Sequence, residues 1–205
     1  MAIRHFTQRA IGLWLMLFVI MVHISGGTQL LDPQKIWQEA EIAERQTVAD
    51  LGCGGVGHFV IPAARLVGED GTVYAVDILK SVLQNVASRA RLEGYKNVKT
   101  VWSNLEVPGA TKVADKSLNA ATLINILFQS KGHEEILREA KRMLKGEGTL
   151  VIVDWKKESK PFGPPTVDRV NPNELKKKAI KVGFSFVKEF EAGPYHFGLV
   201  FVKPV

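Results

Sequence analysis

Cysteine is almost absent from this 205-residue chain: Cys53 is the only one. A single cysteine excludes a disulfide within the chain and a metal cluster held by several thiolates. We therefore predict no metal site, and we expect a protein of a reducing compartment such as the cytoplasm. Cys53 lies inside a glycine-rich stretch, where a small side chain explains it better than a nucleophilic thiolate does.

Aromatic residues are scarce in the basic part of the chain, where only Trp155 and Phe162 occur. The net charge is +6 and the sequence pI is near 9.4, and eleven lysines and arginines fall between positions 141 and 181. Surfaces that bind single-stranded nucleic acid combine cations with stacking aromatic rings. We therefore expect these cations on solvated helix faces and at helix C-termini, where they are favourable. A nucleic-acid or anionic-lipid partner is the alternative.

One long apolar run stands out from an otherwise ordinary composition of 46% hydrophobic and 23% charged residues. It covers residues 10–24 and follows Arg4 and Arg9. The run is shorter than the roughly 20 residues that span a bilayer. Residues 25–27 lack the small-x-small pattern of a signal-peptide cleavage site.

We therefore divide the chain into an apolar N-terminal segment, residues 1–25, and one globular domain, residues 26–205. Three interpretations of the segment stay open. It contacts a membrane through residues 11–24, it packs on the domain, or it precedes the true start at Met16 or Met21. The expected location is the cytoplasm, either free or held at a membrane by this segment.

The centre of the domain is a glycine turn between a strand and a helix. An apolar run at residues 47–51 predicts a buried strand, and residues 58–66 have apolar positions at helical intervals. Between them stand Gly52, Gly54 and Gly57. Glycines allow a tight turn and let a ligand approach the backbone, and the first N–H groups of the following helix face that ligand.

An acid completes this unit. Residues 71–77 predict the next strand, which ends in Asp77, twenty residues after Gly57. At this distance a carboxylate can accept hydrogen bonds from ribose hydroxyls. The same pattern suits a dinucleotide, so the glycines and Asp77 alone leave the ligand open.

Asp50 helps to choose between ligands. It comes two residues before Gly52, at the mouth of the turn. A pyrophosphate there would meet a second negative charge, whereas S-adenosylmethionine (SAM), with its ammonium and sulfonium groups, would be attracted. The stretch from Asp50 to Gly57 resembles the first motif of the class I SAM-dependent methyltransferases, with one extra residue before the last glycine.

The rest of the chain agrees with this resemblance from about Thr28 onward. Strands are expected at residues 97–102, 119–127, 149–155, 184–190 and 196–202, with helices at 33–42, 80–92, 133–145 and 171–182. The final hairpin is typical of class I methyltransferases. We therefore expect an α/β fold: a Rossmann-like, mostly parallel, seven-stranded sheet with an antiparallel last strand and helices on both faces.

The resemblance also implies a set of cofactor-binding residues. In the family, a polar residue after the third strand meets the adenine amino group, which Asn104 matches by position, and residues after the fourth strand face SAM and the acceptor. Asn119 departs from the Asp that the family usually has. The residues expected to bind SAM are Asp50, Gly52, Cys53, Gly54, Gly57, Asp77, Ile78, Asn104, Leu105 and Asn125.

A pocket for the methyl acceptor is expected at the same sheet edge, because ligands bind at the carboxyl ends of parallel strands. The topology brings Trp155 and Tyr195 there as candidate pocket residues. If the acceptor must lose a proton, His196, Asp154 and His133 are candidate bases, although His133 also suits a helix start.

The predicted function is transfer of a methyl group from SAM to a small-molecule acceptor. The chain looks most like the branch that contains the ubiquinone and menaquinone methyltransferases. A related arsenite-methylating branch needs several cysteines and is disfavoured. A nucleic-acid methyltransferase is one alternative. A nicotinamide-dependent oxidoreductase is the other, although the Tyr-x-x-x-Lys spacing at residues 95–99 falls before a strand, where that motif cannot serve. The acceptor and the oligomeric state stay open.

Overall fold

A computed structural model describes residues 30–158 and 162–205. The N-terminal segment, including residues 11–24, lies outside the described residues, so the prediction for it stays a prediction. The strands in chain order are β1 (Thr47–Leu51), β2 (Thr72–Asp77), β3 (Val98–Trp102), β4 (Leu118–Ile124), β5 (Leu144–Trp155), β6 (Ser185–Gly193) and β7 (His196–Val202).

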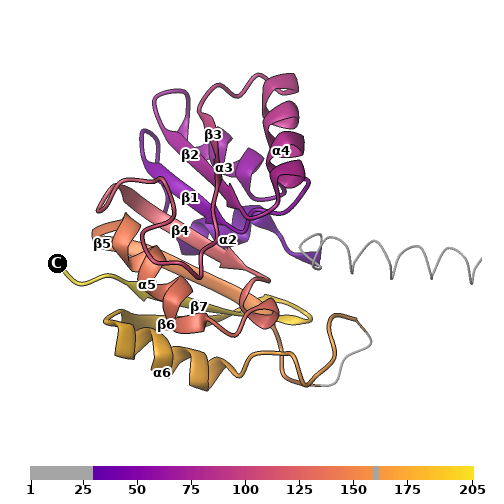
Figure 1. Ribbon diagram of the computed structural model, residues 1–205, viewed down its shortest axis with the longest axis vertical. Helices are drawn as coiled ribbons and strands as arrows, with labels where there is room; N and C mark the ends of the chain where they lie inside the picture. The colour runs from indigo at the N-terminus through magenta and orange to yellow at the C-terminus, as the bar shows by residue number, and fades with distance from the viewer. Residues whose placement is uncertain (1–29, 159–161) are drawn as a thin grey trace, which may run out of the picture.

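Helices alternate with the strands up to β3, and a loop then leads to β4 (Figure 1). The helices are α2 (Pro33–Glu39), α3 (Val60–Val67), α4 (Lys80–Leu92), the 3₁₀ turn η2 (Leu127–Gln129), α5 (His133–Met143) and α6 (Pro172–Val182).

The strands form one sheet in the order β3-β2-β1-β4-β5-β7-β6. β1 pairs in parallel with β2 and β4, β2 with β3, and β4 with β5. β7 lies between β5 and β6 and is antiparallel to both. This is the seven-stranded fold expected from the sequence. The strand order turns back between β1 and β4, which is where an open α/β sheet binds its ligand.

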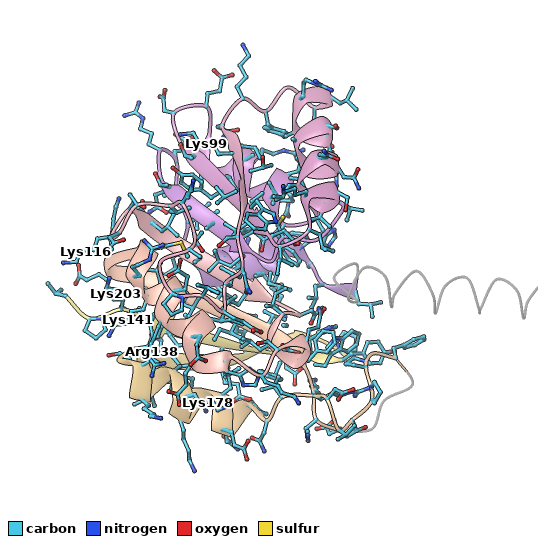
Figure 2. All side chains as sticks on the ribbon, in the orientation of Figure 1. Lys99, Lys116, Arg138, Lys141, Lys178 and Lys203 are labelled. Atoms are coloured by element: carbon cyan, nitrogen blue, oxygen red, sulfur yellow. The ribbon has the colours of Figure 1, made fainter. Side chains whose placement is uncertain are left out.

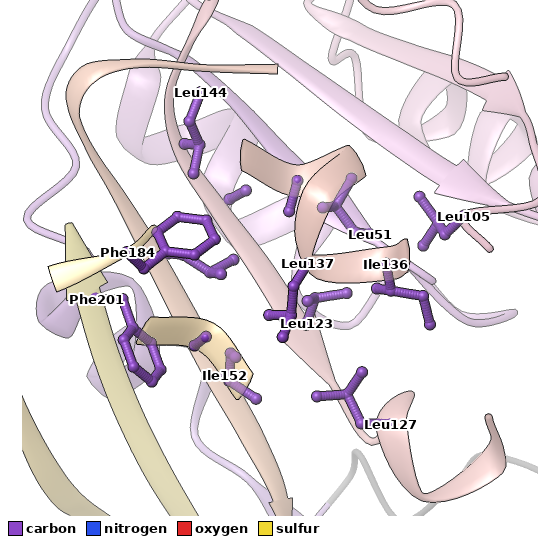
Figure 3. Close-up of a cluster of buried hydrophobic side chains, with 14 of the residues drawn as sticks. Leu51, Leu105, Leu123, Leu127, Ile136, Leu137, Leu144, Ile152, Phe184 and Phe201 are labelled. Carbon is purple, nitrogen blue, oxygen red and sulfur yellow. The ribbon is translucent and has the colours of Figure 1, made fainter. Parts of the chain in front are cut away.

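Helices cover both faces of the sheet. On one face, α2, α3 and α4 pack on alternate residues of β1 and β2, such as Val48 and Val73. On the other face, α5 and α6 bury a cluster that includes Leu123, Leu137 and Ile152 (Figure 3). Because side chains alternate across a strand, β5 supplies Val153 to the first layer and Ile152 to the second.

Local chemistry explains where two of the helices begin. The Asp32 side chain accepts a hydrogen bond from the Gln34 N–H at 2.9 Å, with Pro33 as the first helical residue of α2. Asn171 does the same for α6, accepting from the N–H groups of Asn173 and Glu174. The sequence predicted helices from residues 33 and 171, within one residue of both observed starts.

Several strand boundaries differ from the prediction, and two of the differences have a plain structural cause. β4 ends at Ile124 rather than at residue 127, because Asn125 takes a positive φ of 55° and the chain then turns into η2. β5 begins at Leu144 rather than at residue 149, because Leu144 pairs with Leu118 before the register shifts. The first difference changes which residues reach the ligand edge.

Candidate functional site

A cleft of about 440 Å³ opens at the carboxyl ends of β1 to β4. It is lined by Gly52, Cys53, Gly54, Gly55, Val56, Asp77, Ile78, Leu79, Val82, Ser103, Asn104, Leu105, Glu106, Ile124, Asn125, Ile126, Gln129, Ser130 and Ile136. Eight of the ten residues predicted to bind the cofactor line this cleft. The other two, Asp50 and Gly57, lie behind it.

The glycine turn after β1 forms one wall of the cleft. Gly52 and Gly54 both have positive φ, at 81° and 65°. A Cβ on Gly52 would lie 2.2 Å from the Ile126 Cδ1 atom, whereas a Cβ on Gly54 would meet no atom within 4 Å. Gly52 is therefore required by packing, and Gly54 leaves backbone open toward the cleft.

Asp77 connects the end of β2 to the glycine turn. Its carboxylate accepts hydrogen bonds from the Gly54 N–H at 3.2 Å and from the Leu79 N–H at 2.9 Å. The side chain also lines the cleft. Since a carboxylate has about four acceptor positions, Asp77 can hold the turn and still accept hydroxyl groups from a ligand.

Asp50 lies beneath the turn and is 1% exposed. One carboxylate oxygen accepts a hydrogen bond of 2.8 Å from Thr122 Oγ1, and the other, Oδ2, has no hydrogen-bond partner among the described residues. Burial raises the pKa of Asp50 to about 7; the Thr122 bond opposes this and the charge of Asp77 adds to it. The result is a buried acid whose charge a nearby cation would stabilise.

The end of the cleft formed by β2 and β3 is mostly apolar. Ile78, Leu79, Val82 and Leu105 contribute side chains to it. Asn104 lies among them, and its Oδ1 accepts a hydrogen bond from the Glu106 N–H at 2.9 Å. Ser103 and Glu106 line the cleft beside Asn104. Apolar walls with a few polar groups suit a planar heterocycle.

The segment after β4 forms the opposite wall. Asn125 is buried, lines the cleft, and its N–H donates to the Val153 carbonyl at 2.9 Å. The Gln129 side chain donates to the Asn125 carbonyl at 2.8 Å. Gln129 and Ser130 also line the cleft, and the sequence analysis missed them because it extended the strand to residue 127. The polar run Gln129–Ser130 was the available signal.

Cys53 lines the cleft and is buried. Burial raises the pKa of its thiol well above the ordinary range, and the charges of Asp50 and Asp77 raise it further. A thiol in this environment stays protonated and is a poor nucleophile. The position therefore suits a small residue in a crowded turn, as expected.

The candidate acceptor residues come together at the ends of β5 and β7. Trp155 pairs with His196 across the two strands, and their rings lie 4.1 Å apart between centroids. Both are buried, at 1% and 0% exposed, and neither lines the cleft. Burial lowers the pKa of His196 to about 3, with Lys156 and Arg169 adding to this effect.

Asp154 is also fully buried at this edge. Its carboxylate accepts hydrogen bonds from the Phe128 N–H at 3.1 Å and from the Trp155 N–H at 2.8 Å. Burial raises its pKa to about 7, and the backbone hydrogen bonds oppose that rise. Asp154 thus fixes the turn η2 that brings Gln129 to the cleft.

The two remaining candidates lie away from the cleft. His133 begins α5, and its ring nitrogens lie 2.8 Å from the Leu127 carbonyl and 3.1 Å from Lys178 Nζ. Tyr195 lies in the β6–β7 turn, where its carbonyl accepts from the Lys156 N–H and its ring packs edge-on against Phe162.

The basic residues late in the chain mostly serve the fold (Figure 2). Lys141 Nζ donates to the Val182 carbonyl at the end of α6, and Lys203 Nζ donates to carbonyls at the end of α5. Lys181 pairs with Glu134. This agrees with the expectation of solvated faces and helix ends. Among the helices that the structure describes, none is long and apolar enough to cross a membrane.

Comparison with known proteins identifies the family. The model of a methyltransferase domain matches residues 42–187. The chain belongs to this methyltransferase family. It superposes on a SAM-dependent methyltransferase from Aquifex aeolicus with a TM-score of 0.78 and 27% identity, covering 85% of this chain and 91% of that one. A putative type 11 methyltransferase from Sulfolobus solfataricus follows, with a TM-score of 0.68, 25% identity, and coverage of 86% and 94%.

Curated relatives point in the same direction. A ubiquinone/menaquinone biosynthesis C-methyltransferase from Klebsiella pneumoniae is 35% identical over 113 residues, which are 55% of this chain and 43% of that protein. A 2-phytyl-1,4-naphtoquinone methyltransferase from Nostoc punctiforme is 29% identical over 136 residues, 64% of this chain and 58% of that protein. The chain spans about half the length of the curated relatives it matches.

These findings confirm the predicted fold and the predicted class, a SAM-dependent methyltransferase with likeness to the quinone-modifying branch. They lend no support to the nicotinamide-dependent or nucleic-acid-modifying alternatives. The residues of the cleft also fit SAM. Gly54 leaves open backbone toward the cleft, Asp77 offers a carboxylate, and Asp50 places a buried, half-satisfied acid beneath the turn.

Proposed function

We propose that this protein transfers a methyl group from SAM to a small-molecule acceptor that reaches the cleft beside Asn125. Bound SAM supplies an electrophilic methyl group on a sulfonium. The role of the protein is then to hold the two reactants in line and to exclude water, which removes much of the entropic cost of their encounter.

The observation that carries this proposal is the pair of carboxylates around the glycine turn. Asp77 lines the cleft and Asp50 lies buried beneath it, where Thr122 is its one side-chain hydrogen-bond partner among the described residues. Two carboxyl groups at this point disfavour a pyrophosphate and favour a cationic ligand, which would stabilise the ionised form of Asp50. A nicotinamide dinucleotide would meet both charges with its own phosphates.

Each part of the cleft has a proposed role. Asp77 accepts hydrogen bonds from ribose hydroxyls, and Asp50 stabilises the positive charge of the amino-acid part. Ile78, Asn104 and Leu105 hold the adenine ring. Asn125 and Gln129 form the polar wall where the acceptor approaches.

Proton removal depends on the acceptor. Among the described residues that line the cleft, none is a histidine or a lysine, and the acids are Asp77 and Glu106. An acceptor that arrives already deprotonated needs no base at all. For an acceptor that must lose a proton, the candidate bases Asp154 and His196 and the candidate acceptor contacts Trp155 and Tyr195 would first have to become accessible, because none of them lines the cleft.

The test is a transfer assay with methyl-tritiated SAM and a panel of phenols, quinols, amines and bulk RNA. Label is expected in a small-molecule product, lost with Asp77→Ala and retained with Asp70→Ala. Asp70 is a matched control because its side chain is 78% exposed and, in the part of the chain that the structure describes, pairs with Arg45 alone. Label confined to RNA would contradict the proposed acceptor class, and failure to bind SAM would contradict the cofactor.

A further inference from the structure

A second cavity of about 310 Å³ adjoins the cofactor cleft. It lies between the first turns of α5 and α6 and the segment that follows β5, and Ser130 lines both spaces. Unlike the apolar end of the cleft, this cavity has mainly polar walls: His133, Lys157, Lys178 and the two acids Asp168 and Glu174.

The His133 ring orients one of the cavity's cations. The Lys178 ammonium can only donate, so the Nδ1 atom of His133, 3.1 Å away, must be the acceptor. The ring proton therefore lies on Nε2, which donates to the Leu127 carbonyl at 2.8 Å. Lys178 is half-buried and forms no ion pair with a described carboxylate. The neutral His133 ring therefore holds the Lys178 ammonium at the cavity wall.

Two more cations lie on the opposite wall. Lys157 Nζ donates to the Arg169 carbonyl at 2.9 Å. Arg169 is 4% exposed, and its guanidinium donates to four backbone carbonyls between residues 156 and 164. Neither residue pairs with a carboxylate in the described part of the chain. The wall therefore carries positive charge that only carbonyl dipoles offset.

The acids of the cavity do not cancel this charge. Asp168 and Glu174 are both exposed, so water and salt screen them. Lys157 is exposed as well, so its charge is screened in the same way. Arg169 is buried and Lys178 half-buried, so the fields of these two cations are screened less. The potential inside the cavity is accordingly set by the cations.

We propose that this cavity binds an oxyanion, the carboxylate or phosphate group of the methyl acceptor, with the ammonium groups of Lys178 and Lys157 as its ligands. The acceptor would pass Ser130, leaving its anionic end in the cavity and its reactive end in the cleft. The assignment to the acceptor rests on the proposed function, whereas the oxyanion site itself does not.

The experiment uses the full chain, with sodium phosphate and sodium benzoate as probes. The imidazole signals of His133 are followed by NMR, because an anion bound to Lys178 changes the hydrogen bond at Nδ1. Saturable shifts are expected with at least one probe. Sodium chloride at equal ionic strength is expected to cause none.

Lys178→Met should weaken probe binding by about tenfold or more, since it removes a charged hydrogen bond. Lys177→Met, an exposed neighbour on α6, is the matched control and should bind like the wild type. Lys157→Met is the second variant, and thermal unfolding checks that each variant is folded. Equal binding by Lys178→Met and wild type, or no saturable shift in the wild type, would overturn the oxyanion site.

Calorimetry with SAM on the same samples separates the two proposals. SAM binding without probe binding would contradict this site alone, and probe binding without SAM binding would contradict the proposed function alone. Benzoate that binds more tightly when S-adenosylhomocysteine fills the cleft supports the acceptor assignment. If S-adenosylhomocysteine did not change phosphate binding and benzoate did not bind, the assignment of the cavity to the acceptor would be overturned.

Discussion

Thr122 Oγ1 donates a hydrogen bond of 2.8 Å to Asp50 Oδ1, from the strand next to the one that leads into the glycine turn. This single bond orients the buried carboxylate and leaves its second oxygen without a partner among the described residues. Asp50 is thereby fixed beneath the cofactor cleft, in a state that titrates near neutral pH.

Binding of SAM should release a proton from Asp50. Its pKa of about 7 means that the carboxyl is partly protonated at neutral pH, and a bound cation favours the ionised form. SAM affinity should therefore rise as pH increases through about 7 and level off above it. Calorimetry in two buffers of different ionisation enthalpy measures how many protons are released when SAM binds. Asp50→Asn should bind SAM more weakly with no proton release, and a wild-type count of zero at pH 7 would argue against this role.

Glu139 should control stability in acid. It is buried and accepts hydrogen bonds from Arg142 and from the N–H groups of Gly109 and Thr111. Burial acts to raise its pKa, but these bonds prevail and lower it to about 2. A lowered carboxyl pKa contributes stability above the ordinary value of 4.5, and this is lost as pH falls from 4.5 toward 2.

Glu139→Gln should therefore cost about 3 kcal/mol of unfolding free energy at neutral pH, because it leaves Arg142 partly unpaired. Its stability should also change less than that of the wild type between pH 4.5 and 2. Urea unfolding across this range is the measurement. Glu135→Gln, an exposed change on the same helix, should stay within about 0.5 kcal/mol of the wild type. If the unfolding free energies of Glu139→Gln and wild type changed equally between pH 4.5 and 2, the titration of Glu139 would not be the cause of the loss of stability in acid.

Gly52 and Gly54 should differ in what an added methyl group does. Gly52→Ala places a Cβ against Ile126 in addition to the left-handed strain, so it should lose about 2–4 kcal/mol of stability. Gly54→Ala meets no neighbour and should lose only about 1–2 kcal/mol, while SAM binding weakens. Ile126→Ala combined with Gly52→Ala should show a favourable coupling energy of about 1 kcal/mol or more in thermal unfolding. If the stability losses of Gly52→Ala and Ile126→Ala simply added in the double variant, an added Cβ at Gly52 would not clash with Ile126.

His196→Phe separates packing from catalysis. The ring is buried against Trp155, and both of its nitrogens lack a hydrogen-bond partner in the described structure. Phenylalanine keeps the ring contact and removes two unsatisfied polar atoms, so stability should stay equal or rise by about 1 kcal/mol. If His196 acts only in packing, the transfer rate should also be unchanged. A loss of more than about 100-fold in rate with unchanged stability would assign it as the base.

The sequence was sufficient to predict the sheet, the glycine turn and part of the cleft, because those features depend on local patterns. Apolar runs mark β1 and β4. Gly52 directly follows the first of these runs, and Asp77 lies at a set distance along the chain from the glycine turn. The final hairpin distinguished this fold from a dinucleotide-binding one, since β7 is antiparallel to its neighbours.

The rest depends on tertiary structure. Gln129 reaches the cleft only because Asn125 adopts a positive φ and Asp154 caps the following turn, and neither effect has a local signature. Sequence spacing also could not reveal that Asp50 lies beneath the turn rather than in the cleft. Trp155 and His196 were correctly predicted to be neighbours, but the register alone did not show that both are fully buried.

The most direct test of the central claim is calorimetric titration with SAM, S-adenosylhomocysteine and NAD, on the wild type, Asp77→Ala and Asp70→Ala. The account predicts that the wild type and Asp70→Ala bind both adenosyl ligands but not NAD. Asp77→Ala should bind them about 10- to 100-fold more weakly, since it loses charge-assisted hydrogen bonds. Binding of NAD in place of SAM, or equal SAM affinity in Asp77→Ala and wild type, would contradict the account.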